Sequence, residues 1–174
     1  MEKVMAVIRE EQEGDIAGIR EVNDRAFDQG QEGEIVDELR AGCKELVSLV
    51  ATEGEKIVGH ILFSPAIIES GGEKVNGMGL APMAVLPEYQ RKGVGSMLVQ
   101  KGIEKVREMG YPFIIVLGHA EYYRRFGFER ASIYGIKSQW DVPDEAFMVM
   151  ILDGVTMSGV SGTGRYREEF NRAM

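Results

Sequence analysis

Five consecutive apolar residues, Phe113–Leu117, constrain the fold of this chain more than any other segment. Their lack of polar–apolar alternation is typical of a strand buried on both faces, as in a parallel pair. Apolar residues at helical spacing predict an amphipathic helix just before them, over about Gly95–Met109. Gly110 and Pro112 bar the continuation of this helix. A further strand is predicted before this helix, over Met78–Leu86. Strand, helix and buried strand together predict a βαβ unit.

The rest of the chain predicts antiparallel strands and short helices. Two turns, Thr52–Glu55 and Glu69–Lys74, separate three apolar runs, which is typical of an antiparallel meander. The predicted fold class is therefore α+β, with a mixed and mostly antiparallel central sheet flanked by helices. The other predicted strands are Val4–Ile8, Leu46–Ala51, Ile57–Phe63, Ala131–Ile136 and Phe147–Leu152, and the other predicted helices are Ile16–Phe27, Glu34–Ala41 and Ala120–Phe126.

The length of 174 residues predicts a single domain, which we place over residues 1–153. From Gly154 onward the chain is rich in glycine and serine, a composition that does not build a core by itself. We therefore expect residues 154–174 to form an appended tail or lid that is mobile without substrate.

Charge and cysteine content exclude several classes of protein. Acidic residues outnumber basic ones by 28 to 20, and the formal net charge is −8, which makes nucleic acid a poor candidate partner. No apolar run has the length of a membrane helix, so no membrane partner is expected. The single cysteine, Cys43, cannot form an internal disulfide, so we expect a cytoplasmic protein. Because dimers are the commonest oligomers in general, we expect a monomer or a homodimer.

The segment Gln90–Ser96 carries a signal for phosphate binding. Gly93 and Gly95 allow unusual backbone angles just before a predicted helix, so several N–H groups can point outward together. Arg91 and Lys92 add positive charge at the same place. These features favour a phosphate site over a turn whose glycines only permit tight packing. Neither a Walker P-loop nor a dinucleotide-binding motif is satisfied, because the lysine precedes the glycine and the third small residue is missing.

The stretch Leu80–Gly95 resembles the acetyl-CoA-binding signature of the GNAT N-acetyltransferases. The core of that signature, Gln/Arg-x-x-Gly-x-Gly/Ala, is matched by Gln90, Gly93 and Gly95. Tyr122–Phe128 resembles the second landmark of the family, a tyrosine four residues before Gly-Phe. The order of the predicted elements extends the resemblance over the whole predicted domain. Within the family, the sequence is most similar to the bacterial YhbS-type acetyltransferases.

The resemblance implies where acetyl-CoA, the cosubstrate, binds. The strand ending at Val85 is implied to carry a β-bulge and to splay from the next parallel strand, which opens a cleft for acyl-CoA. Backbone groups of Met83 and Val85 are implied to pair with the pantetheine arm, and the Met83 N–H to face the thioester carbonyl, where negative charge develops. The implied contacts to coenzyme A come from Met83, Ala84, Val85, Gln90, Arg91, Lys92, Gly93, Val94, Gly95, Ser96 and Tyr123.

Tyr123 matches the position of the general acid of the family. When an amine attacks the thioester, coenzyme A leaves as a thiolate, which a nearby phenol can protonate. Spacing alone favours the alternative that Tyr122 and Tyr123 are both packing aromatics. The resemblance reverses that preference for Tyr123, and Tyr122, about a quarter-turn away, is expected to pack.

The sequence does not specify the general base. In the histone-acetylating branch a Glu on the bulged strand has this role, but Gly79 stands at that position here. His119 follows the buried strand and has a suitable pKa, although a helix-capping or surface role is the favoured alternative. Glu121, Glu88 and a chain of waters are further candidates. Two distant histidines and one cysteine give no metal-ligand pattern, so no metal is expected, and His60 is expected to pack within its strand.

The resemblance implies an N-acetyltransferase that moves the acetyl group of acetyl-CoA to an amine by direct attack in a ternary complex. Because Cys43 has no nearby partner, an acetyl-cysteine intermediate is not expected. The alternative is a non-catalytic acyl-CoA-binding sensor or interaction module of the same fold. The acceptor amine is not encoded in any motif, and the net negative charge only mildly favours a cationic one.

Overall fold

The computed structural model describes residues 5–174, so Val4, the start of the first predicted strand, lies outside the described residues. The chain forms two compact units, each assembled from segments that are distant in sequence. Unit 1 consists of Met1–Phe63 and Pro82–Lys105 with Ala173, and unit 2 of Ser64–Ala81 and Val106–Arg172 with Met174. Two long strands, β3 (Lys56–Ser70) and β4 (Glu73–Val85), run through both units.

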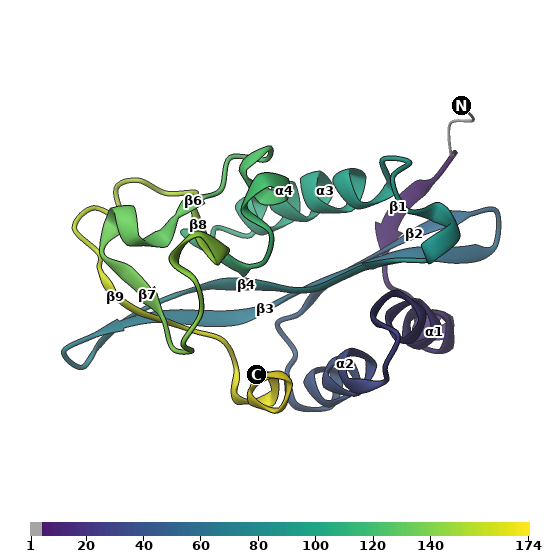
Figure 1. Cartoon of the computed structure of the whole chain (residues 1–174), viewed down its shortest axis with the longest axis horizontal. Coiled ribbons are helices and arrows are strands. Elements are labelled where there is room, and N and C mark those ends of the chain that lie inside the picture. The colour runs from purple at the N-terminus through teal and green to yellow at the C-terminus, as the bar shows by residue number, and fades with distance from the viewer. Residues whose placement is uncertain (1–4) are drawn as a thin grey trace. The chain divides into compact units, whose positions relative to one another are not determined.

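Unit 1 is a small antiparallel sheet with helices on both faces. Strand β1 (Val7–Glu10) pairs with β2 (Val47–Glu53), and β2 pairs with the first half of β3. Helices α1 (Ile16–Phe27) and α2 (Gln31–Gly42) lie on one side of these strands, and α3 (Val94–Glu108) lies on the other (Figure 1). The helices predicted from apolar periodicity are therefore confirmed, and α2 begins three residues earlier than predicted.

The helices of unit 1 bury most of the residues that the periodicity selects. The apolar residues at helical spacing that are buried are Ile19, Val22, Ile35, Val36, Leu39, Leu98, Val99, Ile103 and Val106. Ile16, Phe27 and Met109 have the same spacing but are 40%, 38% and 44% exposed, because Ile16 and Phe27 are the end residues of α1 and Met109 directly follows α3. Gly102 lets α3 approach β3 closely, since a Cβ at this position would overlap the ring of Phe63.

Unit 2 contains the parallel pair that the unbroken apolar run predicted. Strand β5 (Phe113–Leu117) pairs in parallel with β4 and antiparallel with β8 (Phe147–Ile151), which also pairs with β6 (Glu129–Arg130). Helix α4 (Ala120–Arg124) follows β5. The strand order β1-β2-β3-β4-β5-β8-β6 makes a mixed and mostly antiparallel sheet, so the predicted α+β fold class is confirmed.

The strand predicted over Ala131–Ile136 is wrong. Ala131–Tyr134 forms a 3₁₀ helix, and Gly135, at a φ of 71°, turns the chain into the short strand β7 (Ile136–Ser138). A positive φ suits glycine and interrupts an extended run, which is why the apolar composition of this segment misled the prediction.

The segment after Gly154 contains secondary structure, although its composition predicted an appended tail. Strand β9 (Gly162–Arg165) pairs in parallel with β7 and antiparallel with Ile67–Glu69 of β3. Its glycines permit close packing, since a Cβ at Gly164 would lie 2.8 Å from the ring of Phe147. The boundary between residues 153 and 154 does not separate the two compact units. No helix in the described part of the chain is long and apolar enough to cross a membrane.

Candidate functional site

The turn between β4 and α3, in unit 1, has the backbone geometry of an anion site. Arg91 and Gly93 both adopt positive φ, 62° and 87°. Nothing lies within 4 Å of a Cβ built on Gly93, so glycine is required there by the backbone conformation and not by crowding. The N–H of Met97 donates to Gly93 O at 3.1 Å, which is the first hydrogen bond of α3. The N–H groups of Val94 and Gly95 come before this bond and therefore have no acceptor within the helix.

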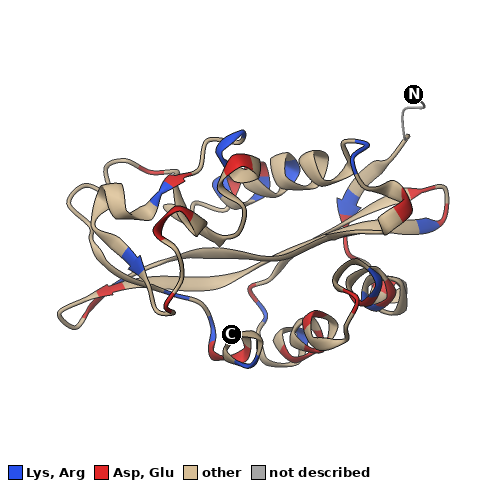
Figure 2. Cartoon of the chain, in the orientation of Figure 1, with Lys and Arg blue, Asp and Glu red and all other residues tan. Residues whose placement is uncertain are grey.

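Cationic side chains gather around Tyr89, beside this turn. Lys92 Nζ lies 5.9 Å and Lys56 Nζ 5.5 Å from the centre of the Tyr89 ring. The Tyr89 hydroxyl donates to Glu53 Oε1 at 3.1 Å, which fixes the ring that both lysines approach. Arg91 is exposed on the turn itself, where Figure 2 shows basic residues just before α3. Positive charge therefore lies beside the N–H groups at the start of α3, in unit 1.

Gln90 joins this turn to the end of β4. Its side-chain Nε2 donates to Val85 O at 3.0 Å, and its backbone N–H donates to Pro87 O at 3.3 Å. Leu86 N–H donates to Val58 O at 2.9 Å, which ties the chain after Val85 to β3. On β4 itself, Met83 is half-buried, whereas Ala84 and Val85 are buried. The side-chain nitrogen of Gln90 is thus used in a hydrogen bond within the protein.

Tyr123 lies in unit 2, on α4, with its ring against the backbone of Gly118. A Cβ at Gly118 would be 2.7 Å from Cε2 of this ring, so the contact requires glycine. Tyr123 is 9% exposed, and its ring also meets the ring of Phe128 edge-on, with 5.8 Å between the centres. Burial, and secondarily the phenol of Tyr122, raise the pKa of Tyr123 far above its ordinary value. The hydroxyl therefore stays protonated and has a proton to donate.

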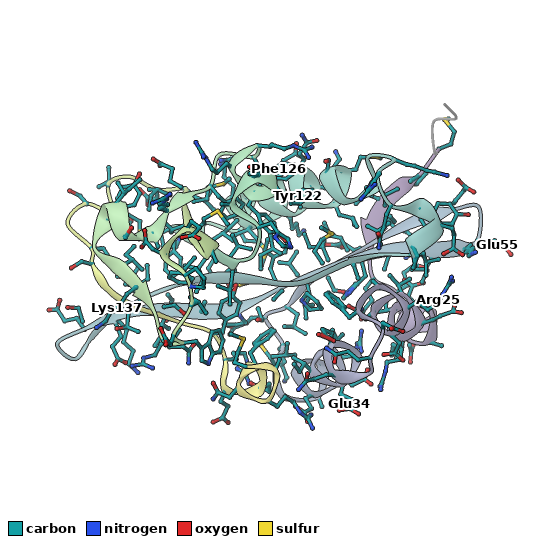
Figure 3. The ribbon with its side chains drawn as sticks, viewed as in Figure 1. Arg25, Glu34, Glu55, Tyr122, Phe126 and Lys137 are labelled. Atoms are coloured by element: carbon teal, nitrogen blue, oxygen red, sulfur yellow. The ribbon has the colours of Figure 1, made fainter. Side chains whose placement is uncertain are left out.

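Tyr122 belongs to an aromatic cluster on α4 and directly after it, of which Tyr122 and Phe126 are labelled in Figure 3. Its ring contacts the ring of Phe126 edge-on at 5.4 Å, and Arg125 lies 5.2 Å from its centre. It also meets the Tyr123 ring at a right angle, with 5.0 Å between the centres. These contacts are those of a packing residue, as the sequence predicted for Tyr122.

His119 occupies the N-cap position of α4, and its side chain is exposed. Its carbonyl oxygen accepts the N–H groups of Tyr122 and Tyr123 at 3.1 and 3.2 Å, but its ring makes no capping hydrogen bond. Glu121 is exposed on the same helix. In unit 1, Arg25 pairs with Glu88 at 2.8 Å; a backbone hydrogen bond and this arginine lower the pKa of Glu88 and make it a weaker base.

Tyr166, which directly follows β9, was not predicted from the sequence. Its ring covers Gly79, where a Cβ would lie 2.6 Å from Cε2 of the tyrosine, so a glutamate side chain does not fit at that position. Its hydroxyl lies 3.0 Å from Leu80 O and 3.3 Å from Ile115 O. A glycine inside a strand signals the close approach of another group, but nothing local in the sequence identifies a tyrosine so far along the chain as that group.

Among residues 5–174, no cluster of three or more His, Cys, Asp or Glu side chains could hold a metal ion. The turn before α3 offers amide N–H groups and cationic side chains, and the surroundings of α4 offer phenols. Such groups suit a phosphate-bearing ligand in unit 1 and proton donation in unit 2.

Comparison with known proteins defines the class. The sequence model of the acetyltransferase (GNAT) domain matches residues 7–131. The chain is 35% identical to the uncharacterized N-acetyltransferase YhbS of Escherichia coli K12, over 95% of this chain and 99% of that protein. The chain therefore belongs to the GNAT family of N-acetyltransferases.

Two solved structures resemble the whole of this fold. YhbS from Escherichia coli, in complex with CoA, matches with a TM-score of 0.90 and 34% identity over 99% of this chain and 95% of that one. A GNAT family acetyltransferase from Brucella melitensis, in complex with acetyl-CoA, matches with a TM-score of 0.78 and 34% identity over 96% and 99%. The similarity to YhbS includes nearly all of the segment after Gly154, well beyond the match to the family domain.

Proposed function

We propose that the protein transfers the acetyl group of acetyl-CoA to an amine by direct attack within a ternary complex. The observation that carries this proposal is Tyr123, which is buried in unit 2 and whose raised pKa keeps its hydroxyl protonated. A non-catalytic acyl-CoA-binding module needs no proton donor at this position. The CoA and acetyl-CoA held by the two similar solved structures support the choice of cosubstrate.

In this proposal, the turn before α3 binds the pyrophosphate of coenzyme A. The N–H groups of Arg91–Ser96 point toward the phosphate oxygens, and Lys92 contributes charge. Gln90 holds the turn against Val85 through its amide, so its role is to position this binding segment. Backbone groups of Met83, Ala84 and Val85 bind the pantetheine arm, and the Met83 N–H stabilises the thioester oxygen as it becomes negative.

The acetyl transfer requires two proton movements. The amine nitrogen forms a bond to the thioester carbonyl carbon, and the carbon–sulfur bond then breaks. Tyr123 gives its proton to the departing thiolate, and the new amide nitrogen loses one. The exposed ring of His119, or water, accepts the second proton; Glu88 is disfavoured by its pairing with Arg25. No metal is required for these steps.

Measurement of CoA release with a panel of amines tests the proposed activity, and Tyr123→Phe tests the acid. This variant keeps the ring on Gly118 and removes only the hydroxyl, so kcat should fall by ~10²–10⁴-fold with the acetyl-CoA Kd nearly unchanged. Tyr122→Phe is the matched control on the adjacent residue and should retain most of the wild-type rate. Equal losses in both variants would assign the pair to packing, and a wild-type rate for Tyr123→Phe would refute the assigned role. Tight acetyl-CoA binding without turnover of any amine would favour the non-catalytic alternative.

A further inference from the structure

Tyr166 connects two neighbouring parallel strands through a single hydroxyl group. Its oxygen lies 3.0 Å from the carbonyl oxygen of Leu80 on β4 and 3.3 Å from that of Ile115 on β5. The phenol is thus held by backbone groups of both strands, and it is 7% exposed.

These backbone groups lie where the two strands separate. The paired residues are Met78–Leu80 of β4 and Ile114–Val116 of β5, and β4 then continues to Val85. We call the position after the last pair, Leu80 and Val116, the fork. The hydroxyl of Tyr166 bonds Leu80, the last paired residue of β4, and therefore sets the direction in which that strand leaves the pairing.

The ring of Tyr166 is fixed from several sides. It stacks on Trp140 with 5.6 Å between ring centres and meets the ring of Phe170 edge-on at 5.1 Å. Its backbone N–H donates to Gln139 Oε1 at 2.7 Å, and the face toward β4 rests on Gly79. Such a clamped ring places its hydroxyl at one position, which is what a positioning group requires.

The phenol of Tyr166 is suited to holding a position and not to moving protons. Burial raises its pKa far above the ordinary value, and the nearby phenol of Tyr123 raises it further, against the opposing effect of the Leu117 N–H. It stays protonated and donates its one hydrogen to a backbone carbonyl, so it is neither a base nor an acid with a proton available for transfer.

We propose that Tyr166 is a positioning residue that holds the fork between β4 and β5 open for the thioester end of acetyl-CoA. The proposal rests on the proposed function, because the pantetheine arm is expected to bind β4 just beyond Leu80. It also assigns a role to the segment after Gly154, which contributes the group that fixes the strand on which the cosubstrate binds.

Tyr166→Phe tests the proposal by removing only the hydroxyl. Loss of one hydrogen bond from the fork should raise the Kd and KM for acetyl-CoA about three- to tenfold. The kcat should change little, because Tyr123 remains in place. The matched control is Tyr134→Phe, which removes another tyrosine hydroxyl of unit 2, one that donates to Glu129 Oε1 at 2.6 Å and not to either strand of the fork. It should leave the acetyl-CoA Kd unchanged.

A second variant, Gly79→Ala, places a methyl group against the ring of Tyr166 and should weaken acetyl-CoA binding in the same direction. Wild-type affinity in either folded variant would overturn the proposal, as would equal affinity losses in Tyr134→Phe and Tyr166→Phe. Failure of both fork variants to fold would make Tyr166 an ordinary core residue and overturn it too. Absence of acetyl-CoA binding by the wild-type protein would instead refute the proposed function itself.

Discussion

His60 shows how a single buried residue is kept neutral in unit 1. It is fully buried on β3, as the sequence predicted, and its Nδ1 lies 3.1 Å from Asn23 Nδ2. That amide nitrogen also donates to Ile19 O at 3.0 Å, which fixes its orientation and makes Nδ1 the acceptor. The proton therefore resides on Nε2, which faces Ser48 Oγ at 3.0 Å. The Ser48 hydroxyl in turn donates to Glu11 Oε1 at 2.7 Å.

This arrangement predicts a loss of stability in mild acid. Burial lowers the pKa of His60 from 6.5 to about 4, so the unfolded chain takes up the proton first. Unfolding becomes easier as the pH falls from 6.5 to about 4, and the full difference corresponds to about 3 kcal/mol. Urea unfolding at stepped pH values measures it. In His60→Gln, which does not titrate, the slope over this range should flatten, and an unchanged slope would show that other groups cause it.

Helix α3 shows what a single element contributes to the proposed site. Two glycines with nearly the same φ flank it, Gly93 at 87° directly before the helix and Gly110 at 85° two residues after its end, and nothing lies within 4 Å of a Cβ at either one. They differ in what surrounds them, because only Gly93 lies on the turn that carries Arg91 and Lys92. Variants at these two glycines can therefore distinguish an effect of backbone strain on stability from an effect on ligand binding.

Gly93→Ala and Gly110→Ala form a matched pair of variants. Each places a side chain at a positive φ and should cost stability by a similar amount, ~1–2 kcal/mol. Only Gly93→Ala should also reduce the affinity for CoA, because it turns the amide N–H groups of the turn away from the phosphates. Thermal unfolding and CoA titration by calorimetry measure the two effects. Equal CoA affinity in both variants would contradict the phosphate-binding assignment.

The elements that the sequence predicts well are those whose signal is local. Phe113–Leu117 predicted a parallel strand before its partner strand was known, because five consecutive apolar residues indicate burial on both faces. Strand β9 and Tyr166 were missed because their partners lie far away in sequence, on β3 and β4. The sequence showed at Gly79 only that the glutamate of the family is missing. That the ring of Tyr166 fills the space of a side chain there cannot be inferred from neighbouring residues.

At the scale of the whole molecule, the ligand should stabilise the folded chain by mass action. Coenzyme A at a hundred times its Kd adds about 2.7 kcal/mol to the free energy of unfolding. For a chain of this size that corresponds to a rise in melting temperature of about 5–11 °C. Pantetheine, which lacks the pyrophosphate, should give a much smaller shift at the same concentration. An equal shift from both ligands would argue against phosphate binding at the turn before α3.

The hydrogen bond between Tyr166 and Leu80 also bears on the order in which the chain assembles. These residues are 86 positions apart, whereas α1, α2 and the β2–β3 hairpin form within one continuous stretch of unit 1. Closing a long loop costs entropy before any contact compensates for it, so distant pairings form slowly. On dilution from denaturant, helical circular dichroism should recover before the capacity to bind CoA. The proposed acetyl-CoA site is then among the last parts of the protein to form, and a newly made chain has its helices before it binds the cosubstrate.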